Sequence, residues 1–137
     1  MNQEVTKRLL VKRSVESTLN NRCAVIATLR LFATKWKPCI LCYLAQQPMR
    51  YNELYRIIPN ISRKMLSEHL KELDANGLIV RTQYDDKLQR VDYHLSDRGR
   101  SLMPILEQLQ DWGLTHMENV LSIREMVQVT LEGDRQV

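Results

Sequence analysis

Residues 62–95 read SRKMLSEHLKELDANGLIVRTQYDDKLQRVDYHL, and the spacing of apolar side chains changes within this stretch. In its first half, leucines recur at helical intervals between a serine suited to cap a helix and a glycine suited to end it: Ser62, Leu66, Leu70, Leu73 and Gly77. In its second half, apolar and polar residues alternate over residues 78–84 and 91–95, which is typical of strands. The stretch therefore predicts a helix followed by a β-hairpin, with residues 85–89 at its tip.

Helical periodicity continues on both sides of this stretch. Further helices are predicted over residues 2–20, 24–33, 38–46 and 52–58, and a long one begins after the capping residue Ser96. A helix-turn-helix followed at once by a hairpin is the order of a winged helix-turn-helix. The predicted fold is mainly α with a small two-stranded antiparallel hairpin, to which dimerisation helices are added at the N- and C-terminal ends.

The composition is that of one globular domain with an uneven charge distribution. The chain has 137 residues, of which 44% are hydrophobic, and a formal net charge of +4. Residues 1–64 carry a net charge of +9 and residues 65–137 a net charge of −5. A basic half favours an anionic partner such as DNA, although a solvated basic surface has the same composition. No apolar run is long enough for a membrane span, so we expect a cytoplasmic protein that does not bind a membrane.

Many residues along the chain stand in the order found in HxlR-type regulators, which this sequence resembles from about residue 22 to residue 116. The resemblance is carried by Cys23, Lys35-Trp36, Ile40-Leu41, Arg50-Tyr51-Asn52-Glu53-Leu54, Pro59-Asn60-Ile61-Ser62, Leu66, Leu70, Leu73, Gly77-Leu78-Ile79, Arg81, Val91-Asp92-Tyr93-His94-Leu95-Ser96, Gly99 and Trp112-Gly113. It implies a dimeric winged-helix repressor or activator that binds pseudo-palindromic operators. The family's usual Arg-Phe pair is Arg50-Tyr51 here, and the proline that usually follows its cysteine is Ala24. We divide the chain into an N-terminal helix or arm (1–21), the winged-helix domain with its C-terminal dimerisation helix (22–121) and a tail (122–137).

The polar side of the helix after Ser62 is the predicted DNA-reading surface. If the leucines face inward, Lys64, Ser67, Glu68 and Lys71 face outward, and an α-helix fits the major groove. Residues of the helix-turn-helix entrance and of the wing are better suited to contact phosphates. The full set of predicted DNA-binding residues is Arg50, Ser62, Arg63, Lys64, Ser67, Glu68, Lys71, Lys87, Gln89 and Arg90. Outside a winged helix, the same face would be read as a solvated surface with a Lys64–Glu68 ion pair.

The three cysteines have different expected roles. Cys39 and Cys42 form a CxxC, but no second CxxC supplies further metal ligands, so we expect two packed helix cysteines and no metal or other cofactor. Cys23 lies at a predicted helix start next to Arg22, where the reactive thiolate is favoured. It also stands thirteen residues before Trp36, which the resemblance identifies as a position that senses oxidants or electrophiles. A packed, inert cysteine is the alternative interpretation.

The last long helix has a wider apolar arc than one small core can cover. We expect the surplus residues to form a homodimer interface: Leu109, Trp112, His116, Met117, Val120 and Leu121. The sequence shows no phosphate-binding glycine loop, catalytic triad or carboxylate pair, so we expect no enzyme. The leading hypothesis is a DNA-binding regulator, which we expect from the resemblance to be a repressor. A repressor controlled by a small-molecule effector and a protein-interaction winged helix without DNA binding remain open.

Overall fold

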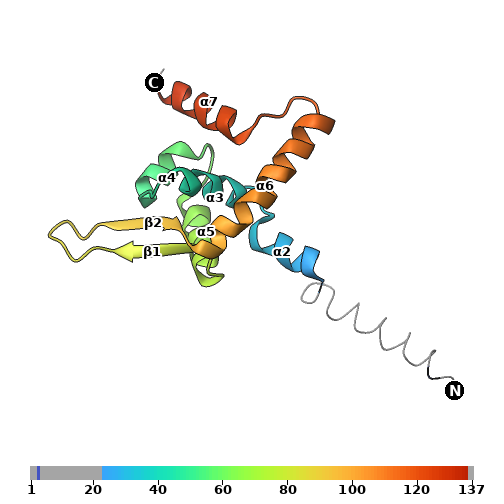
Figure 1. Cartoon of the computed structure of the whole chain (residues 1–137). Coiled ribbons are helices and arrows are strands. Elements are labelled where there is room, and N and C mark those ends of the chain that lie inside the picture. The colour runs from blue at the N-terminus through green and yellow to red at the C-terminus, as the bar shows by residue number, and fades with distance from the viewer. Residues whose placement is uncertain (1–2, 4–22, 136–137) are drawn as a thin grey trace. The chain divides into compact units, whose positions relative to one another are not determined.

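A computed structural model describes residue 3 and residues 23–135 of the chain. This part divides between Ala33 and Thr34 into two units, which are described separately. The elements, shown in Figure 1, are α2 Ala24–Phe32, α3 Lys37–Gln46, α4 Tyr51–Ile57, α5 Arg63–Ala75, β1 Ile79–Gln83, β2 Val91–Leu95, α6 Asp97–His116 and α7 Ile123–Arg135. The mainly helical fold with a two-stranded antiparallel hairpin is thereby confirmed. The helix predicted over residues 2–20 lies outside the described residues, apart from residue 3.

The first unit contains α2, which begins directly after Cys23. The backbone of Cys23 is extended, and its carbonyl oxygen accepts a hydrogen bond from the Ala27 amide at 2.8 Å. Cys23 therefore occupies the N-cap position, as the sequence predicted for a helix start. The apolar side chains of Val25 and Leu29 on this helix are exposed.

The core of the second unit is built around α3. Pro38 lies in the first turn of this helix, where its missing amide hydrogen costs no hydrogen bond. Apolar side chains from α3 to α6 and from the base of the hairpin are buried together: Ile40, Leu41, Leu44, Leu54, Leu66, Leu70, Leu73, Leu78, Ile79, Leu95, Leu102 and Leu106. Burial of this apolar surface is the main force that holds α5 against the rest of the unit.

The turn between α4 and α5 is defined by backbone conformation and by a cap. Asn60 has a φ of +64°, a left-handed conformation that asparagine tolerates better than most residues. The Ser62 hydroxyl oxygen accepts a hydrogen bond from the Met65 amide at 3.0 Å, which caps α5 as predicted. Gly77, with a φ of +73°, follows the C-terminal end of the helix.

The hairpin pairs β1 with β2 in antiparallel register from Ile79 opposite Leu95 to Gln83 opposite Val91. The predicted alternation fails at its base, where Leu78 and Ile79 are both buried because the chain is enclosed by the core as it leaves α5. Met49, just before α4, exchanges two backbone hydrogen bonds with Tyr93, at 2.9 and 2.8 Å. This bridge ties the entrance of the helix-turn-helix to β2.

The start of α6 is fastened to the base of the hairpin. The Ser96 hydroxyl accepts a hydrogen bond from the Gly99 amide at 3.0 Å and donates one to the Gly77 carbonyl oxygen at 2.5 Å. A β-carbon on Gly99 would lie 2.1 Å from the carbonyl oxygen of Leu78. Because that obstacle is backbone, only glycine fits at this close approach.

The two sides of α6 have different environments. Leu102 and Leu106 are buried, whereas Ile105, Leu109 and Trp112 are exposed. The spacing of apolar residues in the sequence would place Leu102 on one face with these exposed residues, and that expectation is wrong because Leu102 belongs to the neighbouring stripe, which packs in the core. After α6 the chain forms α7, a helix that takes up most of the segment assigned as the tail. None of the described helices has the length and apolar character required to cross a membrane.

Candidate nucleic-acid interface

The outer face of α5 carries the charged side chains predicted to read DNA. Lys64, Glu68 and Lys71 are exposed, while the leucines on the opposite side of the helix are buried. Lys64 and Glu68 approach each other to 4.0 Å, and the Lys64 side chain is 84% exposed. Such a loose surface pair contributes little to stability, so the lysine is available to a ligand.

Arg63, at the N-terminal edge of this face, is held by aromatic rings of α4. Its guanidinium carbon lies 4.2 Å from the centre of the Tyr55 ring and 5.9 Å from that of the Tyr51 ring. Cation–π contacts of this kind orient an arginine without neutralising its charge. The sequence pattern did not identify these two tyrosines, because their role depends on the angle between α4 and α5.

Ser67 and Tyr51 form the other polar contact between the two helices. The Ser67 Oγ lies 3.2 Å from the Tyr51 hydroxyl oxygen, which in turn lies 3.0 Å from the Arg63 carbonyl oxygen. Ser67 is half-buried, so part of its surface faces outward with the charged residues of α5. Ser62, in contrast, uses its hydroxyl to cap the helix.

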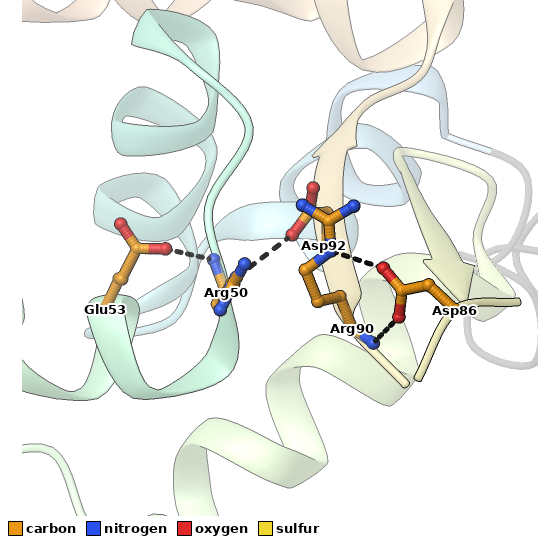
Figure 2. A network of polar contacts seen from close by, with 5 residues as sticks. All are labelled: Arg50, Glu53, Asp86, Arg90 and Asp92. Carbon is orange, nitrogen blue, oxygen red and sulfur yellow. Dashed lines mark hydrogen bonds and ion pairs between the residues drawn. The ribbon is translucent and has the colours of Figure 1, made fainter. Parts of the chain in front are cut away.

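The wing holds one of its predicted DNA contacts in an internal ion pair. The Arg90 Nε lies 2.8 Å from the Asp86 Oδ2, and the Arg90 amide donates to the other carboxylate oxygen (Figure 2). The Leu88 amide donates to that same oxygen. The hydrogen bond from the Arg90 side chain lowers the pKa of Asp86 below its usual value. Arg90 is thus less free than the sequence suggested, whereas Lys87 is exposed. Gln89 is exposed as well and has a φ of +47° at the tip.

Arg50 connects the start of α4 to the hairpin. Its Nε lies 3.7 Å from the Asp92 Oδ1 on β2, and its backbone amide donates to the Glu53 carboxylate at 3.1 Å (Figure 2). Its side chain is 51% exposed. Arg50 therefore retains a surface that a phosphate could contact, next to the wing.

A buried polar cluster lies on the inner side of α5. The Lys37 ammonium is 5% exposed and forms an ion pair with Glu72 of α5, while the Glu72 side chain reaches solvent. His69 is buried beside them, with Nδ1 at 4.0 Å from Glu72 Oε2. Neither of its ring nitrogens has a hydrogen-bond partner among the described residues. The burial of Lys37 was not predicted, and it could have been suspected only from the place of this residue at the start of an otherwise buried helix.

The predicted dimer residues that extend beyond the core are exposed on and after α6. Leu109, Met117 and Leu121 are each about half exposed, and Val120 is 37% exposed. The Trp112 and His116 rings lie 4.7 Å apart and form part of the same exposed region. We call these six residues the α6 apolar surface.

The cysteines differ in exposure. Cys42 is buried and Cys39 is half-buried, as expected for packed helix cysteines. Burial, together with the neighbouring Cys39, raises the pKa of Cys42 to about 12, which makes it unreactive. Cys23 is exposed. The described residues contain no group of three or more side chains placed to hold a metal ion.

Comparisons with known proteins agree with this arrangement. Residues 31–120 match the family model for HxlR-like helix-turn-helix proteins. The HTH-type transcriptional regulator YtcD of Bacillus subtilis is 45% identical over 97 residues, which cover 71% of this chain and 77% of YtcD.

Two of the solved structures that resemble this chain are those of a redox regulator and of a transcriptional regulator in its reduced form. The redox regulator HypR in its oxidized form matches with a TM-score of 0.65 and 35% identity, over 70% of this chain and 99% of HypR. The reduced form of the transcriptional regulator YodB from B. subtilis matches with a TM-score of 0.66 and 30% identity, over 72% of this chain and 98% of YodB.

Proposed function

We propose that this chain, which belongs to the HxlR-like helix-turn-helix family, represses transcription as a homodimer bound to a pseudo-palindromic DNA operator. The relatives in this family are transcriptional regulators and not enzymes. The observation that carries the proposal is the outer face of α5, where Lys64 and Lys71 are exposed beside the oriented guanidinium of Arg63. In this proposal α5 enters the major groove, and Arg50 and the wing residue Lys87 contact phosphates.

Replacement of both lysines tests this assignment. The Lys64→Ala/Lys71→Ala protein is expected to lose operator affinity by roughly a hundredfold or more, because two groove contacts are removed. Both side chains are exposed, so the thermal unfolding midpoint should stay close to that of the wild type. Affinity is measured by fluorescence anisotropy on a duplex selected from randomised DNA.

The matched control removes the same charge elsewhere. Lys35 and Arg124 are exposed and lie outside α4, α5 and the wing, so Lys35→Ala/Arg124→Ala should bind the duplex nearly as the wild type does. Equal losses in the two double variants would mean that α5 does not read DNA. A protein-interaction domain without DNA binding would show no steep dependence of nonspecific duplex affinity on salt.

Thiol control at Cys23 is the second part of the proposal. It is supported by the exposure of Cys23 at the N-cap of α2 and by the similarity to the redox regulator HypR. A peroxide accepts two electrons from the Cys23 thiolate, which becomes a sulfenic acid as the peroxide is reduced. The sulfenic acid can then condense with a thiol, with loss of water, to form a disulfide.

Mild peroxide or an electrophile should weaken DNA binding of the wild-type protein and leave the Cys23→Ser protein unaffected. Cys39→Ser is the matched control and should respond as the wild type does, because Cys39 is half-buried and burial raises its pKa. An unchanged response in Cys23→Ser would exclude Cys23 from the mechanism.

A further inference from the structure

We propose that Tyr51 fixes Ser67 as a hydrogen-bond acceptor toward DNA, so that α5 selects a base with a major-groove amino group, adenine or cytosine, opposite Ser67. This inference rests on the proposed function, in which α5 enters the major groove. It assigns to Tyr51 a positioning role and to Ser67 a defined base preference.

The Ser67 hydroxyl, the Tyr51 hydroxyl and the Arg63 carbonyl oxygen form a chain of hydrogen bonds, and the carbonyl oxygen at its end determines the direction of both bonds. The Arg63 carbonyl oxygen can only accept, so the Tyr51 hydroxyl, 3.0 Å away, donates its single proton there. The Tyr51 oxygen is then an acceptor for Ser67, whose Oγ lies 3.2 Å away. Ser67 thereby uses its own proton, and only its lone pairs remain for a further partner.

The position of Tyr51 is fixed on both sides. Its hydroxyl is bonded to the backbone of α5 and its ring lies 5.9 Å from the Arg63 guanidinium, which also covers the Tyr55 ring at 4.2 Å. Ser67 lies between Lys64 and Lys71 along α5 and is half-buried, so part of the residue reaches the outer face. A base opposite Ser67 would therefore meet an acceptor held in a constant orientation.

This polarity matters because a free serine reads bases ambiguously. Its hydroxyl can donate to the keto oxygens of guanine or thymine, or accept from the amino groups of adenine or cytosine. With the proton committed to Tyr51, a keto oxygen opposite Ser67 would face lone pairs, unless the bond to Tyr51 is broken. Adenine and cytosine should therefore be favoured by roughly fivefold, the contribution of one ordinary hydrogen bond.

The test is a selection of randomised duplexes by the full chain, with base frequencies compared between variants. For the wild type, adenine or cytosine should be enriched at one position of each half-site, and Ser67→Ala identifies that position by relaxing it. Tyr51→Phe should relax the same position alone, because the freed Ser67 proton can then reach keto oxygens. Tyr51→Phe keeps the ring and matches the family's usual residue, so the fold should be retained.

Tyr93→Phe is the matched control. It also removes one tyrosine hydroxyl, but this residue lies on β2 and among the described residues its hydroxyl takes part in no hydrogen bond, so base preference should be unchanged. In the Ser67→Ala background, Tyr51→Phe should have no additional effect.

Three results would overturn the inference while the proposed function stands. Tyr51→Phe could retain the preference that Ser67→Ala removes, the wild type could prefer guanine or thymine at that position, or Ser67→Ala could alter no position. Failure of the proposed function gives a different result from failure of this inference, since neither the wild type nor any variant would then enrich a half-site.

Discussion

At the scale of single residues, the least expected finding is His69, an imidazole buried in α5 without a hydrogen-bond partner among the described residues. Burial, reinforced by the ammonium of Lys37, lowers the pKa of His69, although Glu72 and Glu68 act in the opposite direction. In the unfolded chain the ring titrates near 6.5, its ordinary value. Below that pH the unfolded state binds more protons than the folded state, so acid favours unfolding.

We therefore expect the free energy of unfolding to fall as the pH decreases below 6.5. Urea unfolding at pH 7.5, 6.5 and 5.5 measures this, and His69→Leu should flatten the decrease because no proton can then bind at that position. A further decrease is expected below 4.5, since the hydrogen bond from Lys37 lowers the pKa of Glu72. His94→Gln removes an imidazole on β2, outside both the His69 cluster and the α6 apolar surface, and serves as the control. Parallel pH profiles for His69→Leu and the wild type would contradict the prediction.

Individual residues also show where prediction from sequence succeeds. The burial of Leu66, Leu70 and Leu73 and the cap by Ser62 follow from local periodicity and side-chain chemistry, and both were predicted. The stacking of Arg63 on the tyrosines of α4 depends on how two helices pack, which no spacing within one helix reveals. The contacts at this site that could not be predicted are therefore those between side chains of different helices.

At the scale of elements, the wing is stiffened by its own charges. Asp86 accepts hydrogen bonds from two backbone amides of the tip and pairs with the Arg90 side chain, whose guanidinium also lies 5.1 Å from the Tyr84 ring. These contacts stabilise the conformation of the tip. They also pair the Arg90 guanidinium with Asp86, so it is less available to a phosphate. The wing was predicted as a loop between two strands, yet its internal pairing could not be predicted without the turn geometry.

Release of Arg90 should strengthen DNA binding. Asp86→Asn keeps the shape of the side chain but removes its charge, so Arg90 becomes available to a phosphate. We expect tighter nonspecific duplex binding, with a slope of log affinity against log salt that is steeper by about 1. Affinity measured across a salt series gives this slope.

Asp85→Asn provides a charge-matched control for that measurement. Asp85 is exposed and forms no ion pair with the described residues. Its replacement changes the net charge equally without freeing an arginine. If both variants had the same slope, the effect would come from net charge and not from Arg90.

At the scale of the whole molecule, the α6 apolar surface is large for a protein that remains monomeric. Trp112 is 61% exposed and Leu109 51% exposed, on a helix whose opposite side is anchored in the core. Contiguous exposed apolar side chains of this kind are typical of interaction sites. A two-fold symmetric contact between two copies of the α6 apolar surface would bury these side chains. It would also place the two copies of α5 about 34 Å apart, which is one turn of DNA.

Leu109→Glu should therefore shift the protein to monomer at micromolar concentration and lower operator affinity by at least about tenfold, since one recognition helix then binds alone. Sedimentation velocity measures the mass and anisotropy the affinity. Gln108→Glu adds the same charge to an exposed polar position one residue away and should leave the dimer intact. A wild-type protein that sediments only as monomer would refute the dimer.

Gly99 has a consequence for how such a chain can change over generations. Substitutions of three features can leave the core undisturbed: the Ser67 hydroxyl, the Tyr51 hydroxyl and the charges of the wing tip. The DNA sequence that the protein prefers can therefore change. No other amino acid can occupy position 99 unless the Leu78 carbonyl moves away. If α5 reads an operator as we propose, descendants of this protein can acquire new operators one substitution at a time, but they inherit a fixed junction between hairpin and long helix.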